Sequence, residues 1–371
     1  MSNYKVEFTL KQHTPIIHFQ SDQMGATLRA TELKPKFDRF LIQQFKKDNI
    51  SYDDFLISGQ ENALNYKVNI KVLSNSKEIL TYKTFISKKD RDNLSLKVGS
   101  YFGDLKASKT KDNIQITFIS FDTNLLSVIK KYFIDFINIT NFGTRQNKGF
   151  GSFEVIKIDE KEFNNDILNS LLKYYPKVYK SESNEPLRKI MSDYQLLKSG
   201  SSKPQYKKSL LFEYMCNSKV RWEKRMIKEF MAKDYVKVFS TLKFEKEPVK
   251  CNNEQNFEYQ YIRGLLGISE QIEFLKNNPV DFKDKIQIRI KSSNDSIKRY
   301  KSPITFKVIN RDIYVLATND IPIKGKKFQF SIEGESGILN KPIEVPKEFD
   351  IFKFLDSSLS QLKYQTFKDC K

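Results

Sequence analysis

The sequence predicts an α+β protein made of two ferredoxin-like (RRM-like) domains with a helical insertion between them. The chain has 371 residues, which is more than one compact domain usually holds. Its hydrophobic content of 39% is enough for real cores and argues against a mostly disordered chain. Strand patterns and helix patterns follow one another in both halves. We therefore expect domains at residues 1–160 and 205–371, joined by a helical linker at 161–204.

The first half begins with a strand, a helix and two further strands. Residues 5–12 alternate between apolar and polar side chains, as a half-buried strand does, and Pro15 ends that strand. Apolar residues at spacings of three and four predict a helix over 32–47. Alternating runs at 66–72 and 114–118 predict two strands with one wet face each. The lysine-rich span between these two strands is expected to be an exposed loop.

A second helix and a fourth strand complete this half. Thr123 or Asn124 can cap a helix of apolar residues that ends before Gly143. A new strand begins at Phe153. The resulting order of strand, helix, strand, strand, helix and strand is the split arrangement called ferredoxin-like.

The second half is expected to be another α+β domain. The linker before it is polar, rich in tyrosine and broken by proline and glycine. A basic helical region at 209–233, with Trp222 on its inner face, leads into a strand at 235–244. Later apolar patterns predict strands near 286–290, 304–308, 313–315 and 328–330, and a final helix near 349–362.

The charge balance points to a polyanionic partner. Lysine and arginine number 64 against 45 acids, which gives a formal net charge of +19. Such a surplus suits nucleic acid or an acidic membrane, although a lysine-rich chain can also be basic without a partner. A basic protein that docks on acidic partners or on a membrane stays open as an alternative, but no amphipathic basic anchor is evident.

The cysteine pattern and the start of the chain bear on its location. Cys216, Cys251 and Cys370 lie far apart and encode neither a disulfide framework nor a zinc knuckle. No signal peptide and no membrane-spanning stretch is evident. We therefore expect a cytoplasmic protein with no metal, no cofactor and no membrane contact.

A loop rich in glycine, from Asn141 to Phe153, carries the strongest binding signal. Its glycines permit backbone shapes that other residues resist, so that backbone N–H groups can face a phosphate. Charged and amide side chains lie between the glycines, and an aromatic ring could stack on a base. The loop lacks the preceding strand and the Gly-Lys-Ser/Thr sequence of a nucleotide-triphosphate loop. The RNA-binding residues expected here are Gly143, Arg145, Gln146, Asn147, Lys148, Gly149, Phe150 and Gly151.

Basic residues at the front of the first predicted helix are expected to share a surface with this loop. Arg29 precedes the helix and is expected to reach outward. Lys34, Lys36 and Arg39 fall largely off the apolar stripe of the helix. We expect these four cations to bind RNA together with the loop.

Several motifs resemble those of the RAMP superfamily of CRISPR-associated proteins. Gly143, Arg145, Gly149, Phe150 and Gly151 occupy the places of its Gly-x-Arg-x-x-x-Gly-Phe-Gly loop. Within the superfamily, the sequence is most similar to the two-domain RAMP subunit of Cmr, or type III-B, effectors. The supporting segments are Thr14-Pro15, Glu32-Leu33-Lys34-Pro35, Arg263-Gly264-Leu265-Leu266-Gly267 and Tyr300-Lys301-Ser302-Pro303-Ile304.

The resemblance implies two RAMP domains and a non-catalytic, RNA-binding subunit of an antiviral effector complex. Its partners would be CRISPR RNA or target RNA and the other effector subunits, and Lys301 would add an RNA contact in the second half. A competing hypothesis is a metal-independent endoribonuclease that processes CRISPR precursor RNA, with His13 and His18 as acid and base. Two lone histidines beside a proline are more often packed or hydrogen-bonded than catalytic.

Overall fold

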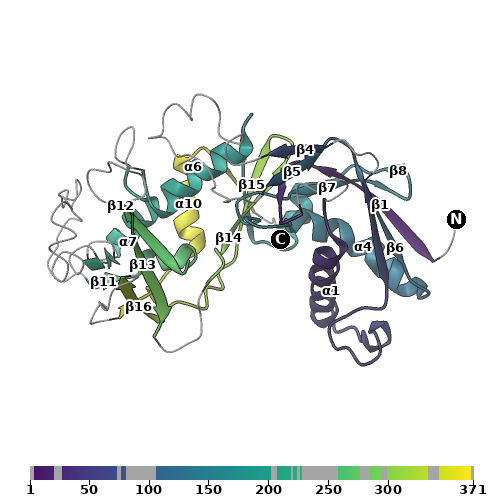
Figure 1. The fold of residues 1–371 in the computed structure, drawn as a ribbon, viewed down its shortest axis with the longest axis horizontal. Helices are drawn as coiled ribbons and strands as arrows, with labels where there is room; N and C mark the ends of the chain where they lie inside the picture. Colours follow the sequence, from purple (N-terminus) through teal and green to yellow (C-terminus); the bar gives the residue numbers. More distant parts are fainter. Residues whose placement is uncertain are drawn as a thin grey trace. The chain divides into compact units, whose positions relative to one another are not determined.

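The computed structural model combines α-helices with mainly antiparallel sheets (Figure 1), so the α+β prediction is confirmed at this level. Two compact units are formed. The first comprises Met1–Ser192, Thr305–Leu316 and Lys363–Lys371, and the second comprises Asp193–Ile304 and Ala317–Leu362. The structure describes residues 4–20, 27–72, 77–80, 106–201, 207–218, 220–223, 226–227, 258–275, 285–293, 299–332 and 342–368. Among these residues, no helix is both long and apolar enough to span a membrane.

The main sheet of the first unit has the strand order β3-β6-β1-β7-β8, and each neighbouring pair is antiparallel. Alternation of apolar and polar residues forms these strands, because one sheet face is buried: Val6, Phe8 and Leu10 of β1 are all in the core. The four predicted strands of this half are confirmed. Their bounds are Lys5–Gln12 (β1), Lys67–Val72 (β3), Ile114–Ile119 (β6) and Phe153–Ile158 (β7), and a short strand that was not predicted, Lys161–Glu162 (β8), follows them.

Two long helices, α1 (Ala30–Lys47) and α4 (Thr123–Ile139), pack into the same core as this sheet. Both helices were predicted. The cap of α4 differs from the prediction, because the Asp122 carboxylate accepts hydrogen bonds from the backbone N–H groups of Asn124 (2.8 Å) and Leu125 (3.0 Å). A side-chain oxygen one residue before the helix satisfies these N–H groups, which Thr123, already inside the helix, does not do.

Three short strands form a second small sheet in the order β2-β5-β4. Their bounds are Ile16–Ile17 (β2), Lys77–Leu80 (β4) and Ala107–Thr110 (β5). The expectation of an exposed loop between the strands at 66–72 and 114–118 is therefore wrong at β4 and β5. Most of that span lies outside the described residues.

A third sheet, β14-β15-β9-β18, lies largely in the first unit although its strands are far apart in the sequence. Strand β9 occurs in the segment that was expected to be helical, where α5 (Ile167–Leu172) and α6 (Pro186–Lys198) are also present. The strand bounds are Lys177–Glu182 (β9), Ile304–Ile309 (β14), Asp312–Ala317 (β15) and Gln365–Lys368 (β18).

The second unit contains the sheet β12-β13-β16-β17 and the parallel pair β10-β11. Trp222 is buried, but it lies in β10 rather than in a helix, so the helix predicted around it is wrong there. The strand predicted at 235–244 lies outside the described residues. The bounds are Leu210–Asn217 (α7), Val220–Trp222 (β10), Glu258–Gln260 (β11), Ile262–Leu266 (η2), Gln271–Leu275 (β12), Lys285–Ser292 (β13), Lys327–Ile332 (β16), Ile343–Glu344 (β17) and Ile351–Gln361 (α10).

Cys216, near the end of α7, is disulfide-bonded. The expectation that the cysteines form no disulfide is wrong for this residue. A wide separation in the sequence does not fix the distance between two side chains in the fold, and only that distance decides whether they can bond.

Candidate functional site

The glycine-rich loop joins α4 to β7 and has a backbone that only glycine permits at two positions. Gly151 has a φ of +66°, and a Cβ atom there would lie 1.9 Å from the Phe142 carbonyl oxygen. Gly143 has a φ of +80°, and its Cβ atom would lie 2.7 Å from the Ile17 carbonyl oxygen. Side chains other than hydrogen are excluded at both positions by backbone atoms, which cannot move aside easily. The glycines therefore allow the loop to pack closely on its neighbours.

The turn after β1 holds one side of the loop. The Thr14 hydroxyl donates to the Gly149 carbonyl oxygen at 2.6 Å and accepts from the Ser152 N–H at 2.9 Å. The Gly151 N–H donates to the Pro15 carbonyl oxygen at 2.8 Å. The Thr14-Pro15 motif thus has a physical role, because it fixes the second half of the loop.

Strand β14 holds the other side of the loop. The Phe306 N–H donates to the Asn147 carbonyl oxygen at 3.1 Å. The Asn141 amide donates to the carbonyl oxygens of Phe306 and Gln146, each at 2.7 Å. Hydrogen bonds therefore satisfy backbone groups on both sides of the loop and restrict its conformation.

The lysine of α1 nearest to the loop, Lys36, is hydrogen-bonded to protein groups. The Lys36 ammonium donates to the Glu32 carboxylate at 2.8 Å and to the Gln146 side-chain oxygen at 3.1 Å. Glu32 in turn accepts from the Gly143 N–H at 2.8 Å, so this pair ties the helix to the loop. We assign Lys36 a positioning role in the loop, which is more specific than the RNA contact expected from the sequence.

Lys34 is also engaged within the protein. Its ammonium donates to the buried Asp38 carboxylate at 2.8 Å and to the Leu64 carbonyl oxygen at 2.7 Å. The same group lies 3.9 Å from the centre of the Tyr66 ring, where a cation–π interaction stabilises it. Arg39, by contrast, is exposed and makes no ion pair with a described residue.

Residues 144–148 are exposed or half-buried and form the outward part of the loop, which carries two neighbouring cations. Arg145 has a φ of +56° and is half-buried, as Gln146, Asn147 and Lys148 are. Burial, together with the nearby Arg145 charge, lowers the pKa of the Lys148 ammonium to about 8. The Arg145 charge disfavours the charged form of Lys148, so an anion bound near both residues would offset this repulsion. The phenyl ring of Phe150 is fully buried and has no exposed face on which a base could stack, contrary to the expectation.

An exposed aromatic ring that sequence reasoning missed lies just before the first helix. The Phe19 side chain is 66% exposed, and the Arg29 guanidinium carbon lies 4.9 Å from the centre of its ring. Phe19 lies two residues after Ile17. The Ile17 carbonyl oxygen accepts a hydrogen bond from the Thr144 N–H of the loop at 2.8 Å. The only sequence signal was one aromatic residue in a polar stretch. Phe19 and Arg29 thus border the loop and offer the stacking surface that Phe150 does not.

A buried lysine, also missed, fixes the two elements that flank the loop. The Lys307 ammonium of β14 donates to the carbonyl oxygens of Ile137 (2.7 Å), Thr140 (3.0 Å) and Phe153 (2.9 Å). Ile137 and Thr140 lie at the end of α4, where free carbonyl groups favour a cation. Burial lowers the pKa of this ammonium to about 7.

Both histidines have their two ring nitrogens occupied by protein groups. His13 accepts from the Asn310 N–H at Nδ1 (3.0 Å), so its proton is on Nε2, which meets the Glu154 carboxylate at 2.9 Å. Burial lowers the pKa of His13, although the Glu154 carboxylate opposes this shift. His18 accepts from the Gln20 N–H (3.1 Å) and donates to the Thr27 carbonyl oxygen (2.9 Å). Neither buried ring is arranged to exchange a proton with a ligand.

Two sequence motifs belong to the second unit. Arg263 donates from Nε to the buried Glu223 carboxylate, which also accepts from the Trp222 indole N–H at 2.9 Å. This network gives Arg263 a structural role. Lys301 is exposed on the second unit.

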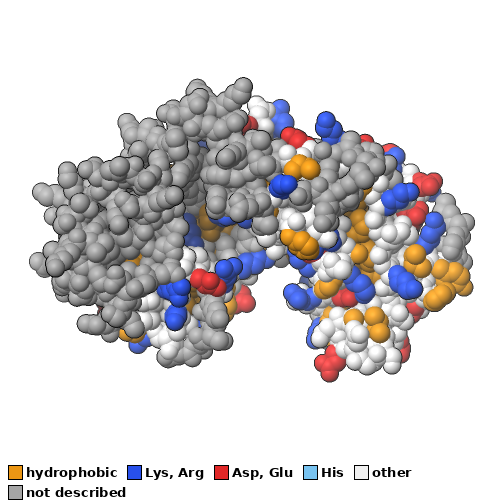
Figure 2. Space-filling view, in the orientation of Figure 1, with side chains coloured by type: hydrophobic (Ala, Val, Ile, Leu, Met, Phe, Trp, Pro, Cys, Tyr) orange, Lys and Arg blue, Asp and Glu red, His pale blue; other side chains and the backbone are white. Residues whose placement is uncertain are grey.

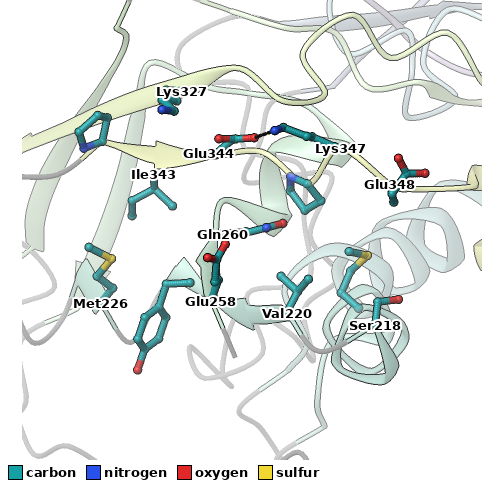
Figure 3. Close-up of a pocket in the computed structure, with 14 residues that line it drawn as sticks. Ser218, Val220, Met226, Glu258, Gln260, Lys327, Ile343, Glu344, Lys347 and Glu348 are labelled. Carbon is teal, nitrogen blue, oxygen red and sulfur yellow. Dashed lines mark ion pairs between the residues drawn. The ribbon is translucent and has the colours of Figure 1, made fainter. Parts of the chain in front are cut away.

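The second unit also contains a cavity of about 740 Å³ (Figure 3). Its lining carries both signs of charge, and Lys347 pairs with Glu344 at 3.2 Å. Glu258 and Glu348 add negative charge to the lining. With three acids against two lysines, the lining is net negative and would repel a phosphate, so we assign this cavity no part in binding nucleic acid.

Two family models together match nearly the whole chain. The sequence model of the Cmr1 N-terminal domain matches residues 3–201, and that of the Cmr1 C-terminal domain matches residues 206–370. No curated protein sequence matches. One similar solved structure is Cmr1 from Pyrococcus furiosus in its apo form, at 13% identity and a TM-score of 0.41, with 98% of each chain covered.

A second solved structure is the type III-B Cmr-beta complex bound to cognate target RNA. One of its chains is 13% identical, with a TM-score of 0.28, 42% of this chain covered and 60% of that chain. Both TM-scores are too low to support an argument, so the assignment depends on the two domain models. These confirm the resemblance to the two-domain RAMP subunit of Cmr effectors. The chain belongs to the Cmr1 family.

Proposed function

We propose that this chain is a non-catalytic RNA-binding subunit of a type III CRISPR effector. It would contact CRISPR RNA or target RNA through the outward part of the glycine-rich loop. The observation that carries the proposal is that Arg145 and Lys148, close enough for one charge to affect the other, lie on a loop that hydrogen bonds fix on both flanks. The net charge of +19 and the family membership support it.

The chemistry of the loop suits a phosphate backbone. Arg145 and Lys148 supply positive charge, and the side chains of Gln146 and Asn147 supply donors or acceptors. Phe19, backed by the Arg29 guanidinium, offers an exposed ring for an unstacked base. Single-stranded RNA has both a phosphate backbone and accessible bases, and is the ligand that uses all of these groups.

The proposal also covers the fold of the first unit and the protein partners of the chain. The strand order β3-β6-β1-β7, with α1 and α4 in one core, supports a ferredoxin-like RAMP domain in the first unit. The other subunits of a Cmr effector would be its protein partners, in the cytoplasm. The domain bounds 1–160, 161–204 and 205–371 remain part of this proposal.

Two alanine substitutions test the role of the loop. Arg145→Ala with Lys148→Ala should weaken the binding of single-stranded RNA and reduce its salt dependence. Each lost phosphate contact lowers the slope of log K against log salt by about one, because fewer counterions are released. Binding would be measured by fluorescence anisotropy of labelled RNA at several salt concentrations.

A matched control removes the same charge elsewhere on the same unit. Lys46 and Lys47 are exposed in the last turn of α1, while the loop contacts the first turn. Lys46→Ala with Lys47→Ala should leave the slope nearer to that of the wild type. Equal slopes for the loop variant and the wild type would refute the role of the loop.

A further inference from the structure

A second aromatic surface lies where β1 begins and β6 ends. Phe121 is 92% exposed, and its ring meets the Tyr4 ring edge-on with centres 5.9 Å apart. Ile119, also exposed, is the last residue of β6. Figure 2 shows exposed hydrophobic side chains beside lysines and arginines at this edge of the first unit. We call Tyr4, Ile119 and Phe121 the aromatic edge.

Lysines flank the aromatic edge on the neighbouring strands. In the sheet register, Ile119 pairs with Lys5 on one side and with Lys67 on the other, so all three share one face. Lys67 is exposed and makes no ion pair with a described residue, and the same holds for Lys71 of β3. Cations and apolar side chains therefore alternate across this face of the sheet.

The acids near this edge are already engaged. Glu7 pairs with Lys5 at 3.3 Å and accepts from the Thr117 hydroxyl at 3.2 Å. Asp122 caps α4 with its carboxylate. The aromatic edge thus combines ring faces with two lysines: Lys67 has no ion pair with a described residue, and Lys5 shares its charge with the Glu7 carboxylate in an exposed ion pair.

The aromatic edge is well separated from the glycine-rich loop. The loop is held at the far end of β1, by Thr14 and Pro15, and the edge lies at the start of β1. An eight-residue strand spans roughly 25 Å, so one side chain cannot reach both surfaces. A ligand that contacts both must be extended along the strand.

We propose that the aromatic edge is a second contact for single-stranded RNA, with Phe121 and Tyr4 stacking on bases and Lys5 and Lys67 meeting phosphates. This inference rests on the proposed RNA-binding function and adds a site to it. Rings beside cations are the features that bind single strands without reading their sequence. Three exposed apolar residues are too few for the core of a stable protein interface, which needs about 1,000 Å² of buried area or more.

The test compares single-stranded and double-stranded RNA bound to the full chain. Phe121→Ala with Tyr4→Ala should weaken single-strand binding roughly tenfold, because stacked bases lose their platform. Binding of double-stranded RNA should not change, because its bases are already stacked within the duplex. Phe121→Trp should retain the affinity for the single strand. Ile50→Ala, which shortens an exposed apolar side chain after α1, is the control and should change neither.

Several outcomes would overturn the inference. The first is unchanged single-strand affinity in the double alanine variant, and the second is an equal loss for both kinds of RNA. The third is unchanged RNA affinity with lost co-assembly with the other effector subunits, which would make the edge a protein interface. A wild-type chain without RNA affinity would refute the proposed function as well. Loss only in the Arg145→Ala and Lys148→Ala variant would refute the aromatic edge alone.

Discussion

Gly151 is the residue whose identity the fold restricts most clearly. Gly151→Ala should lower the free energy of unfolding by about 3 kcal/mol or more, because a positive φ and a backbone clash must both be accommodated. Gly59 also has a positive φ, of +76°, but a Cβ atom there would meet no other atom within 4 Å. Gly59→Ala should cost only about 1 kcal/mol. Urea denaturation of both variants measures this difference, and similar losses would contradict the packing argument.

Lys148 should make RNA binding depend on pH. Its pKa in the free protein is lowered to about 8, and a bound phosphate favours the charged form. Affinity should therefore be flat below about pH 7 and fall as the pH rises through 8. Lys148→Arg keeps the charge and should abolish this fall, as measured by anisotropy between pH 6.5 and 9.5 at constant ionic strength. A variant with the same fall as the wild type would rule out Lys148 as its source.

At the scale of single residues, the sequence identified the loop but not the orientation of its side chains. The glycine spacing and Arg145 were recognisable because a backbone requirement restricts residue type. The burial of Phe150 and the internal contacts of Lys34 and Lys36 were not, because residue type alone does not reveal which partners the fold brings within reach. Phe19 was missed for the same reason.

At the scale of elements, helices and strands with strong periodicity were predictable, and long-range pairings were not. Strand β9 pairs with β15 and β18, which lie more than a hundred residues further along the chain. No local pattern encodes such a partner, so the polar segment around β9 seemed helical. Strand β14 was predicted, but its contact with the glycine-rich loop was not.

Lys307 of β14 is hydrogen-bonded to the end of α4 and to β7, and its titration should change the free energy of unfolding. Its pKa is lowered from 10.5 to about 7, so the unfolded chain binds more protons between these pH values. The free energy of unfolding should consequently rise with pH in this window. Lys307→Met removes this rise and also removes the hydrogen bonds to the carbonyl groups, two of which the neutral amine can still donate near pH 9, at a cost of about 3 kcal/mol.

The Lys307→Met prediction is checked by urea denaturation at pH 6 and pH 9. The difference between wild type and variant should be larger at pH 9, because at pH 6 the wild type must bury a charge. Lys353→Met, on the exposed side of α10, is the control. A difference that does not vary with pH would show that Lys307 is not the titrating group.

At the scale of the whole molecule, the two histidines bear on whether the chain is an enzyme. Because both rings are buried and hydrogen-bonded within the protein, we expect no histidine-dependent cleavage of CRISPR repeat RNA in EDTA. Gel analysis of labelled RNA incubated with the wild type, His13→Ala and His18→Ala checks this. Metal-free cleavage that either substitution abolishes would favour the endoribonuclease hypothesis instead.

The composition and motifs were enough to predict an α+β fold and the correct family. The division into units was harder to predict, because residues 305–316 and 363–371 return to the first unit. Such a return depends on tertiary packing, which adds no signature to the local sequence. The family of the whole chain could therefore be predicted from the sequence, whereas the boundaries of the two units could not.

The central claim is that RNA lies on the outward part of the glycine-rich loop. The most direct measurement is ultraviolet cross-linking of single-stranded RNA to the full chain, with the modified peptides located by mass spectrometry. We expect cross-linked nucleotides on peptides within residues 141–153 and on the peptide that contains Phe19. Efficient cross-linking that omits both peptides would contradict the claim.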